Sequence, residues 1–171
     1  VAVLSSVQIQ ALSTDNIASL STEQVAALNS RAVGALSSGQ LDALSTAQVA
    51  ALVSGQIAAL SSADLAALSS ADIATFTTDE IAVISSAAIS GLSTDAIAGL
   101  GTGQVAAISS RALGSLTSAQ VGALTTAQFA ALSTAQLSQL SSAAVAGIET
   151  GDLATLDSAE LAVLQTRTIA A

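Results

Sequence analysis

LSTAQVAA, at residues 44–51, is the stretch that decides the fold, because the same eight-residue pattern recurs along the whole chain. We letter this octad a to h, with Leu4 as the first a. Position a is large and apolar in every octad, position f is always aliphatic or phenylalanine, and position c is always serine or threonine. Positions g and h are mostly small, while d and e vary freely. A period without insertions indicates a repeat architecture in which each unit packs mainly on its neighbours.

One long continuous helix does not fit this period. Eight residues advance an α-helix by about 80° beyond two full turns, so the apolar a and f positions would spiral around the helix and leave no single face to bury. The hydroxyl side chains at b and c would also lie in mid-helix, where they compete with the backbone for hydrogen bonds. The octad therefore favours a chain of short, separate helices.

Local signals for helix starts support this interpretation. Ser45 and Gln48 have the spacing of a capping box, in which a serine caps the helix and a glutamine three residues later reaches back to the cap. Leu44 and Val49 then have the spacing of a hydrophobic staple. The sequence leaves open whether b or c is the N-cap.

Two octads have a non-polar residue, valine or glycine, at b. Where b is Val53, we expect Ser54 at c to cap the helix, and where b is Gly101, we expect the same of Thr102. Position c keeps its hydroxyl in every octad while b sometimes loses it. A shift of the cap by one residue is thus expected in these octads.

The acidic residues also gather where helices are expected to begin. All except Asp42 lie at b, d or e, where a carboxylate favours the positive end of the helix dipole by roughly 0.3–1 kcal/mol. The acidic residues are Asp15, Glu23, Asp42, Asp64, Asp72, Asp79, Glu80, Asp95, Glu149, Asp152, Asp157 and Glu160. We therefore expect the acids to complement helix dipoles.

Together these patterns predict an all-α solenoid of short capped helices, one per octad and each about two turns, or roughly 10 Å, long. Helices this short are marginal alone, so stacking must stabilise them through a and f, with small g and h residues allowing close approach. Residues 1–171 are expected to form one repeat domain, part of a longer array or capped by other protomers, since both ends are in phase. A β-solenoid is the alternative, and the number of helices per turn stays open.

Composition restricts the function. The chain has 171 residues, of which 51% are hydrophobic and 9% charged, with a formal net charge of −9 and no Cys or His. That charge disfavours nucleic acid and anionic membrane surfaces as partners. The mean hydropathy of +0.72 is high, but Ser or Thr interrupts every octad, so no membrane-spanning segment is expected.

No catalytic, cofactor-binding or metal-binding residue is predicted. Serine nucleophiles lack a His, Lys or Cys base, and we expect no enzyme and no small-molecule substrate. The closest acid pairs, such as Asp79–Glu80, lack the pattern of a calcium loop. Residues 101–103, GTG, lack the lysine and spacing of a phosphate loop. The arginines all occupy d and are expected to be solvated surface residues, although a weak anion contact is the alternative. They are Arg31, Arg111 and Arg167.

The phrase LSTxQ[IV]AAL at residues 44–52, with a close variant at residues 124–132, resembles octad repeats of large, low-complexity bacterial surface and secreted proteins. The resemblance covers the whole chain and implies an extracellular or cell-surface spacer, stalk, adhesin region or self-assembling fibre. Its expected partners are copies of itself or neighbouring repeats of the same protein. An ice-binding array, based on the recurring hydroxyls, and a protein- or peptide-binding scaffold are the alternative functions.

Overall fold

The computed structural model describes the backbone of residues 4–169 and the side chains of residues 4–164. These residues form many short helices and no strand, so the all-α prediction is confirmed and the β-solenoid alternative is wrong for this part of the chain. The elements are α1 (Ser6–Gln10), α2 (Thr14–Ala18), α3 (Thr22–Ala26), α4 (Ser30–Val33), α5 (Ser38–Asp42), α6 (Thr46–Val49), α7 (Ser54–Ile57), α8 (Ser62–Ala67), α9 (Ser70–Ile73), α10 (Thr78–Ala82), η1 (Ile89–Gly91), α11 (Thr94–Gly99), α12 (Thr102–Ala107), α13 (Ser110–Leu113), α14 (Ser118–Gly122), α15 (Thr126–Phe129), α16 (Thr134–Leu137), α17 (Ser142–Val145), α18 (Thr150–Leu153) and α19 (Ser158–Ile169).

The helices begin at the same place in the octad, directly after b. At Ser45, for example, the backbone is extended with ψ 155°, and the hydroxyl accepts a hydrogen bond from the backbone N–H of Gln48. Most helices span only four to six residues, so they are shorter than the expected two turns. Position b is therefore the N-cap, which the sequence left open.

The expected shift of the cap to c is wrong. Val53 and Gly101 remain the N-caps of α7 and α12, although neither provides a side-chain cap. Their backbone N–H groups donate to the Oε1 atoms of Gln56 (2.8 Å) and Gln104 (2.6 Å). The glutamine at e satisfies the N-cap N–H even where b has no hydroxyl, so the helix starts at the same position.

Two octads depart from the regular pattern. In the octad at residues 85–92, a 3₁₀ helix, η1 (Ile89–Gly91), replaces the α-helix. In the last octad, a new helix is expected to begin after Gln165 at b, but α19 continues through this position. Gln165 has no capping hydroxyl, position e of that octad is Thr168 instead of glutamine, and glutamine favours a helix interior. The side chains of Gln165, Thr166, Arg167 and Ile169 lie outside the described residues.

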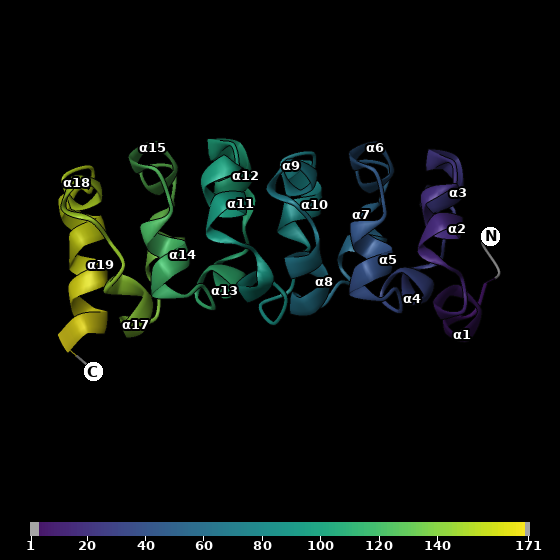
Figure 1. Cartoon of the computed structure of the whole chain (residues 1–171). Coiled ribbons are helices and arrows are strands. Elements are labelled where there is room, and N and C mark those ends of the chain that lie inside the picture. Colours follow the sequence, from purple (N-terminus) through teal and green to yellow (C-terminus); the bar gives the residue numbers. More distant parts are fainter. Residues whose placement is uncertain (1–3, 170–171) are drawn as a thin grey trace.

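Helices that are three octads apart lie side by side. α1 contacts α4, α2 contacts α5, and the same relationship continues to α16 and α19, with η1 taking the place of a helix between α10 and α11. We call three consecutive octads, or 24 residues, a layer; the first layer is residues 5–28. Figure 1 shows the helices in successive groups along one long axis, with α1–α3 at one end and α17–α19 at the other.

The expected core is confirmed between the ends. Side chains at a and f are buried from Leu28 to Leu140, and they form one continuous aliphatic cluster that includes Phe76 and Phe129. Towards the ends burial decreases: Leu4 is half-buried and Leu153 is 40% exposed. Within the described residues, these positions have a neighbouring layer on one side only.

Small residues at g and h let the layers approach closely, as expected. At Gly114 an added Cβ would lie 2.5 Å from the carbonyl oxygen of Gln139, and at Gly34 it would lie 2.8 Å from that of Ala59. Both distances are shorter than real Cβ contacts, so these positions need the absence of a side chain. The backbone of one layer therefore packs directly on the backbone of the next.

From Ala32 onward position e is buried or half-buried, although d and e both vary freely in the sequence. Gln40, Gln48 and Gln56 are 3%, 4% and 1% exposed, whereas d residues such as Ala47 are exposed. Buried amides need hydrogen-bond partners. The partners of these glutamines define the most distinctive polar site of the structure.

Candidate functional site

Each buried glutamine at e joins two layers. Gln56 illustrates the arrangement: its Oε1 atom accepts from the backbone N–H of Val53 at the start of its own helix. Its Nε2 atom donates to the carbonyl oxygens of Val25 (2.8 Å), in the last turn of α3, and of Leu28 (2.7 Å), just after that helix. One carboxamide therefore satisfies a helix N-terminus and a helix C-terminus that have no other side-chain cap.

The same bond recurs along the chain, and we call it the glutamine clamp. In each case Nε2 donates to the carbonyl at a, 28 residues earlier, and also to a carbonyl at f or g, 31 or 30 residues earlier. The clamp residues are Gln40, Gln48, Gln56, Gln104, Gln120, Gln128 and Gln136. Donor–acceptor distances to the a carbonyl lie between 2.6 and 2.8 Å, so the clamp fixes the register of the layers.

One clamp is made by a different residue. Position e of α4 is Ala32, which cannot donate, and the N-cap of the same helix is Asn29. The Oδ1 atom of Asn29 accepts from the backbone N–H of Ala32 (2.9 Å), and its Nδ2 atom donates to the carbonyl of Leu4 (3.0 Å). Leu4 is the residue 28 positions before Ala32, so asparagine at b serves the carbonyl that a glutamine at e would serve.

Acidic residues at e form only half of the clamp. Asp72 accepts hydrogen bonds from the backbone N–H (3.1 Å) and hydroxyl (2.6 Å) of Ser69 through Oδ2. Its Oδ1 atom is buried without a hydrogen-bond partner, and the same is true of Oδ2 of Asp152. A carboxylate cannot donate to the carbonyls of the preceding layer, and aspartate is one methylene shorter than glutamine.

Except for Asp42, at the end of α5, the remaining acids lie at or just after a helix start, as predicted. Thr77 N donates to Oε2 of Glu80 (2.7 Å), and Asp157 N donates to Oε2 of Glu160 (2.9 Å). Hydrogen bonding from the Ser21 hydroxyl lowers the pKa of Glu23, whose side chain is exposed in the first turn of α3. These carboxylates contribute to helix starts, because the first turn favours negative charge.

The acid pairs do not converge on a metal-binding geometry. Among the described residues, no group of three or more Asp or Glu side chains is placed to hold a metal ion. Arg31 and Arg111 are both exposed, as predicted for surface residues, and Arg167 lies outside the described side chains. No helix in the described part of the chain is long and apolar enough to span a membrane.

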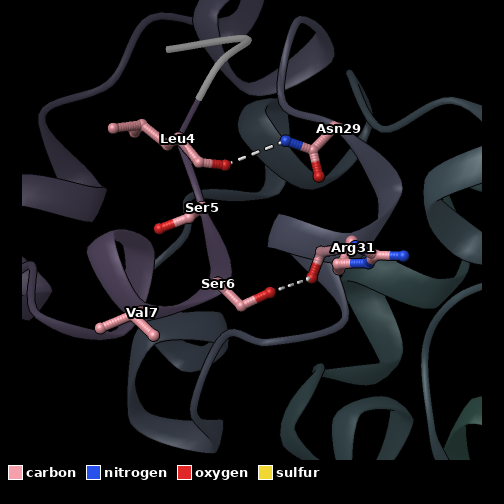
Figure 2. A pocket seen from close by; sticks show the side chains of 6 residues that line it. All are labelled: Leu4, Ser5, Ser6, Val7, Asn29 and Arg31. Carbon is pink, nitrogen blue, oxygen red and sulfur yellow. Dashed lines mark hydrogen bonds between the residues drawn. The ribbon is translucent and has the colours of Figure 1, made fainter.

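An open hollow lies at the N-terminal end, between the starts of α1 and α4 (Figure 2). It has a volume of about 650 Å³ and is lined by Leu4, Ser5, Ser6, Val7, Asn29 and Arg31. The Asn29–Leu4 bond crosses it, and the Ser6 hydroxyl donates to the carbonyl of Arg31 at 3.4 Å. Its polar groups mainly join the first two layers to each other.

The glutamine clamp was missed by sequence reasoning. The capping-box pattern identified Gln48 as the partner of its own N-cap, which the structure confirms. The second bond could not be assigned, because it depends on how many octads separate neighbouring helices. A signal was nevertheless present: e is occupied only by Gln, Asn, Asp, Glu, Ala or Thr, and the large aliphatic residues never occur there.

The fold and its clamps define a helical repeat protein whose polar interior is structural. The chain belongs to the ALTTAQ repeat family, which it matches at residues 1–30, 22–54, 30–62, 57–94, 80–110 and 97–134. These overlapping matches cover residues 1–134 and agree with the octad period found in the sequence. No curated protein and no solved structure matches the chain significantly.

Proposed function

We propose that the chain is a structural spacer of a bacterial cell-surface or secreted protein, built as a solenoid with three octads per turn. The observation that carries this proposal is the clamp between e and a residue 28 positions earlier, which recurs from Gln40 to Gln136. Each layer then binds only its neighbours, so length depends on the number of octads. Such an element sets a distance between the parts it connects.

The surface supports a spacer in preference to a catalytic domain. Exposed d positions carry mostly Ala, Gly and single charges, as at Ala47, Gly55 and Asp79. The polar interior is committed to helix ends, as the Gln56 bonds illustrate. The proposal therefore includes the prediction that the chain has no catalytic role.

A length series tests the solenoid. Residues 37–60 form a three-octad unit that contains the clamps Gln40, Gln48 and Gln56. Inserting one, two or three further copies of this unit should increase the maximum dimension in small-angle X-ray scattering by about 8–10 Å per copy, the usual distance between packed helices. A compact domain would instead have a radius of gyration near 15–16 Å for 171 residues, growing only weakly with length. Sublinear growth would overturn the proposal.

The location requires a separate experiment. Antibodies raised against the 171-residue chain should label intact cells of the bacterium that makes the protein, or detect it in the culture medium. The control is an antibody against a ribosomal protein, which should label only permeabilised cells. Detection of the repeat only after permeabilisation would contradict a surface or secreted role and leave the solenoid geometry untouched.

An ice-binding role is the second candidate, favoured by one row of hydroxyls. Thr78, Thr102, Thr126 and Thr150 occupy c in successive layers, and all are exposed. An added Cβ at Gly103, a d residue, would lie 3.9 Å from Cγ2 of Thr78. The small d residue of one layer therefore lies next to the threonine of the preceding layer. Thermal hysteresis of the purified chain tests this role, and its absence at millimolar concentration would exclude it.

A further inference from the structure

Two buried carboxylates at position e each have an oxygen without a hydrogen-bond partner. Asp72 is 8% exposed and Asp152 is 2% exposed. Asp72 uses its Oδ2 atom to accept from the backbone N–H of Ser69 at 3.1 Å, which leaves its Oδ1 atom unpartnered, and Oδ2 of Asp152 is also unpartnered. Burying an ionised oxygen without a compensating partner is costly. Each of these oxygens therefore marks a place where a positive charge would stabilise the folded chain.

The spacing of the glutamine clamp identifies the groups opposite Asp72. Gln48 Nε2 donates to carbonyl oxygens 31, 30 and 28 residues earlier, at 3.3, 3.2 and 2.7 Å. The same separations from Asp72 lead to the carbonyls of Leu41, Asp42 and Leu44. Helix α9 packs on α6 as α6 packs on α3, so the layers keep the same relationship there. The Asp72 carboxylate therefore faces a group of backbone carbonyls, and the described residues provide no donor to the Leu44 carbonyl.

Asp152 has the same surroundings further along the chain. The carbonyls 31, 30 and 28 residues earlier belong to Val121, Gly122 and Leu124, and α18 packs on α15 as α9 packs on α6. Among the described residues, the Leu124 carbonyl also has no hydrogen-bond donor. Two separate layers thus place one buried carboxylate opposite several carbonyl oxygens, so the arrangement recurs in the protein.

A group made only of oxygen atoms favours a hard cation. In the clamp, an amide N–H donates to the carbonyls, but a carboxylate has no donor and aspartate is one methylene shorter than glutamine. Space for a small ligand is therefore left where glutamine places its amide nitrogen. Gln48 Nε2 lies 2.7–3.3 Å from its carbonyls. Since Ca²⁺ binds carboxylate and carbonyl oxygens at about 2.3–2.6 Å, an ion in that place requires carbonyl shifts of less than about 1 Å.

We propose that Asp72 and Asp152 each bind a Ca²⁺ ion between two layers, with the carboxylate as the charged ligand, backbone carbonyls of the preceding layer as neutral ligands, and solvent completing the shell. Such a site needs only one carboxylate, so it does not require a cluster of three acidic side chains, and the described residues contain none. Without calcium the free oxygen destabilises the contact between layers, and with calcium the ion replaces the glutamine amide. The proposal depends on the packing of the layers and adds a ligand to the chain.

A charge-matched pair of variants tests the proposal. The site variant carries Asp72→Asn and Asp152→Asn, which keep a side-chain oxygen at e and remove both buried charges. The control variant carries Asp79→Asn and Asp95→Asn, which remove two exposed charges in the first turns of α10 and α11. Both variants reduce the formal net charge of −9 by the same two units. A difference between them therefore cannot come from nonspecific attraction of calcium to an acidic chain.

Isothermal titration calorimetry with CaCl₂, and urea unfolding in CaCl₂ or EDTA, provide the readout, with circular dichroism to verify folding. The wild-type chain and the control variant should bind Ca²⁺ with dissociation constants of about 10⁻⁴–10⁻³ M, as weak extracellular calcium modules do. Their urea midpoints should rise in millimolar CaCl₂, because a ligand of the folded state stabilises it. The site variant should bind at least about tenfold more weakly and show no rise. Absence of calcium binding by the wild-type chain, or equal binding by the two variants, would overturn the proposal and leave the spacer role untouched, since scattering tests the shape separately.

Discussion

Gln56 Nε2 lies 2.7 Å from the carbonyl oxygen of Leu28, although the two residues are 28 positions apart in the sequence. The bond connects the start of one short helix to the end of another, and the Gln56 side chain that makes it is buried. A helix of four residues makes only a few backbone hydrogen bonds of its own, so most of its N–H and C=O groups need other partners. A neutral side chain that accepts at one end and donates at the other therefore stabilises the stack, and a carboxamide has this property.

Gln56→Glu should destabilise the protein by about 1–3 kcal/mol, because it removes a buried donor and directs negative charge at the carbonyls of Val25 and Leu28. The substitution keeps the acceptor for Val53 N and nearly the same volume. The midpoint of urea unfolding, followed by circular dichroism, measures the change. Gln24→Glu is the matched control in the exposed first layer, and we expect it to change stability by no more than about 0.5 kcal/mol. Equal effects of the two substitutions would mean that the clamp adds nothing.

The sequence predicts the helices well because their signals are local. The capping box of Ser45 and Gln48 and the apolar pair Leu44 and Val49 lie within six residues, so the octad alone determines where a helix begins. The acids at d and e follow the same local rule. The burial of a and f also follows, since no other positions are consistently large and apolar.

The stacking could not be predicted from the octad. Gln48 bonds Leu20 at a distance of 28 residues, and that spacing depends on three helices making one layer, which is set by how the aliphatic side chains fill the interior. The role of Ser54 was predicted wrongly for a related reason. A hydroxyl at c looks like a substitute cap in isolation, but the glutamine at e holds the helix start at Val53.

Asp72→Gln should stabilise the protein by about 1 kcal/mol. Asp72 leaves its Oδ1 atom buried without a partner. Glutamine would place Nε2 near the carbonyl of Leu44, 28 residues earlier, and would keep the bond to Ser69 N. The urea midpoint should rise, and Asp152→Gln, which replaces the other unpartnered buried carboxylate, should act in the same direction. A fall in the midpoint for both variants would show that the carboxylates have another partner in solution.

Val53→Ser should stabilise α7 by about 0.5–2 kcal/mol, because a hydroxyl at b would accept from the N–H of Gln56 and an exposed valine would be removed. Val53 is 48% exposed, so its side chain contributes little to the core. Thermal unfolding measures the gain. The same experiment separates b from c as the capping position: Ser54→Ala should change stability by less than about 0.5 kcal/mol, whereas Ser45→Ala should lower it by about 1 kcal/mol. A large loss on Ser54→Ala would restore the capping role first expected for it.

Gly91→Ala should lower stability by about 1–3 kcal/mol, because the new Cβ would overlap the carbonyl oxygen of Ser62 in the preceding layer. The clash involves backbone on both sides, so no side-chain rotation can relieve it. Gly99→Ala is the control: it lies in α11 with nothing within 4 Å of an added Cβ, and its φ is not positive. Alanine favours helix over glycine, so this substitution should stabilise the protein by about 0.5–1 kcal/mol. The urea midpoint should therefore fall for Gly91→Ala and rise for Gly99→Ala, although the two glycines are only eight residues apart. Tolerance of Gly91→Ala would mean that the layers lie farther apart in solution than the close approach of Gly91 and Ser62 requires.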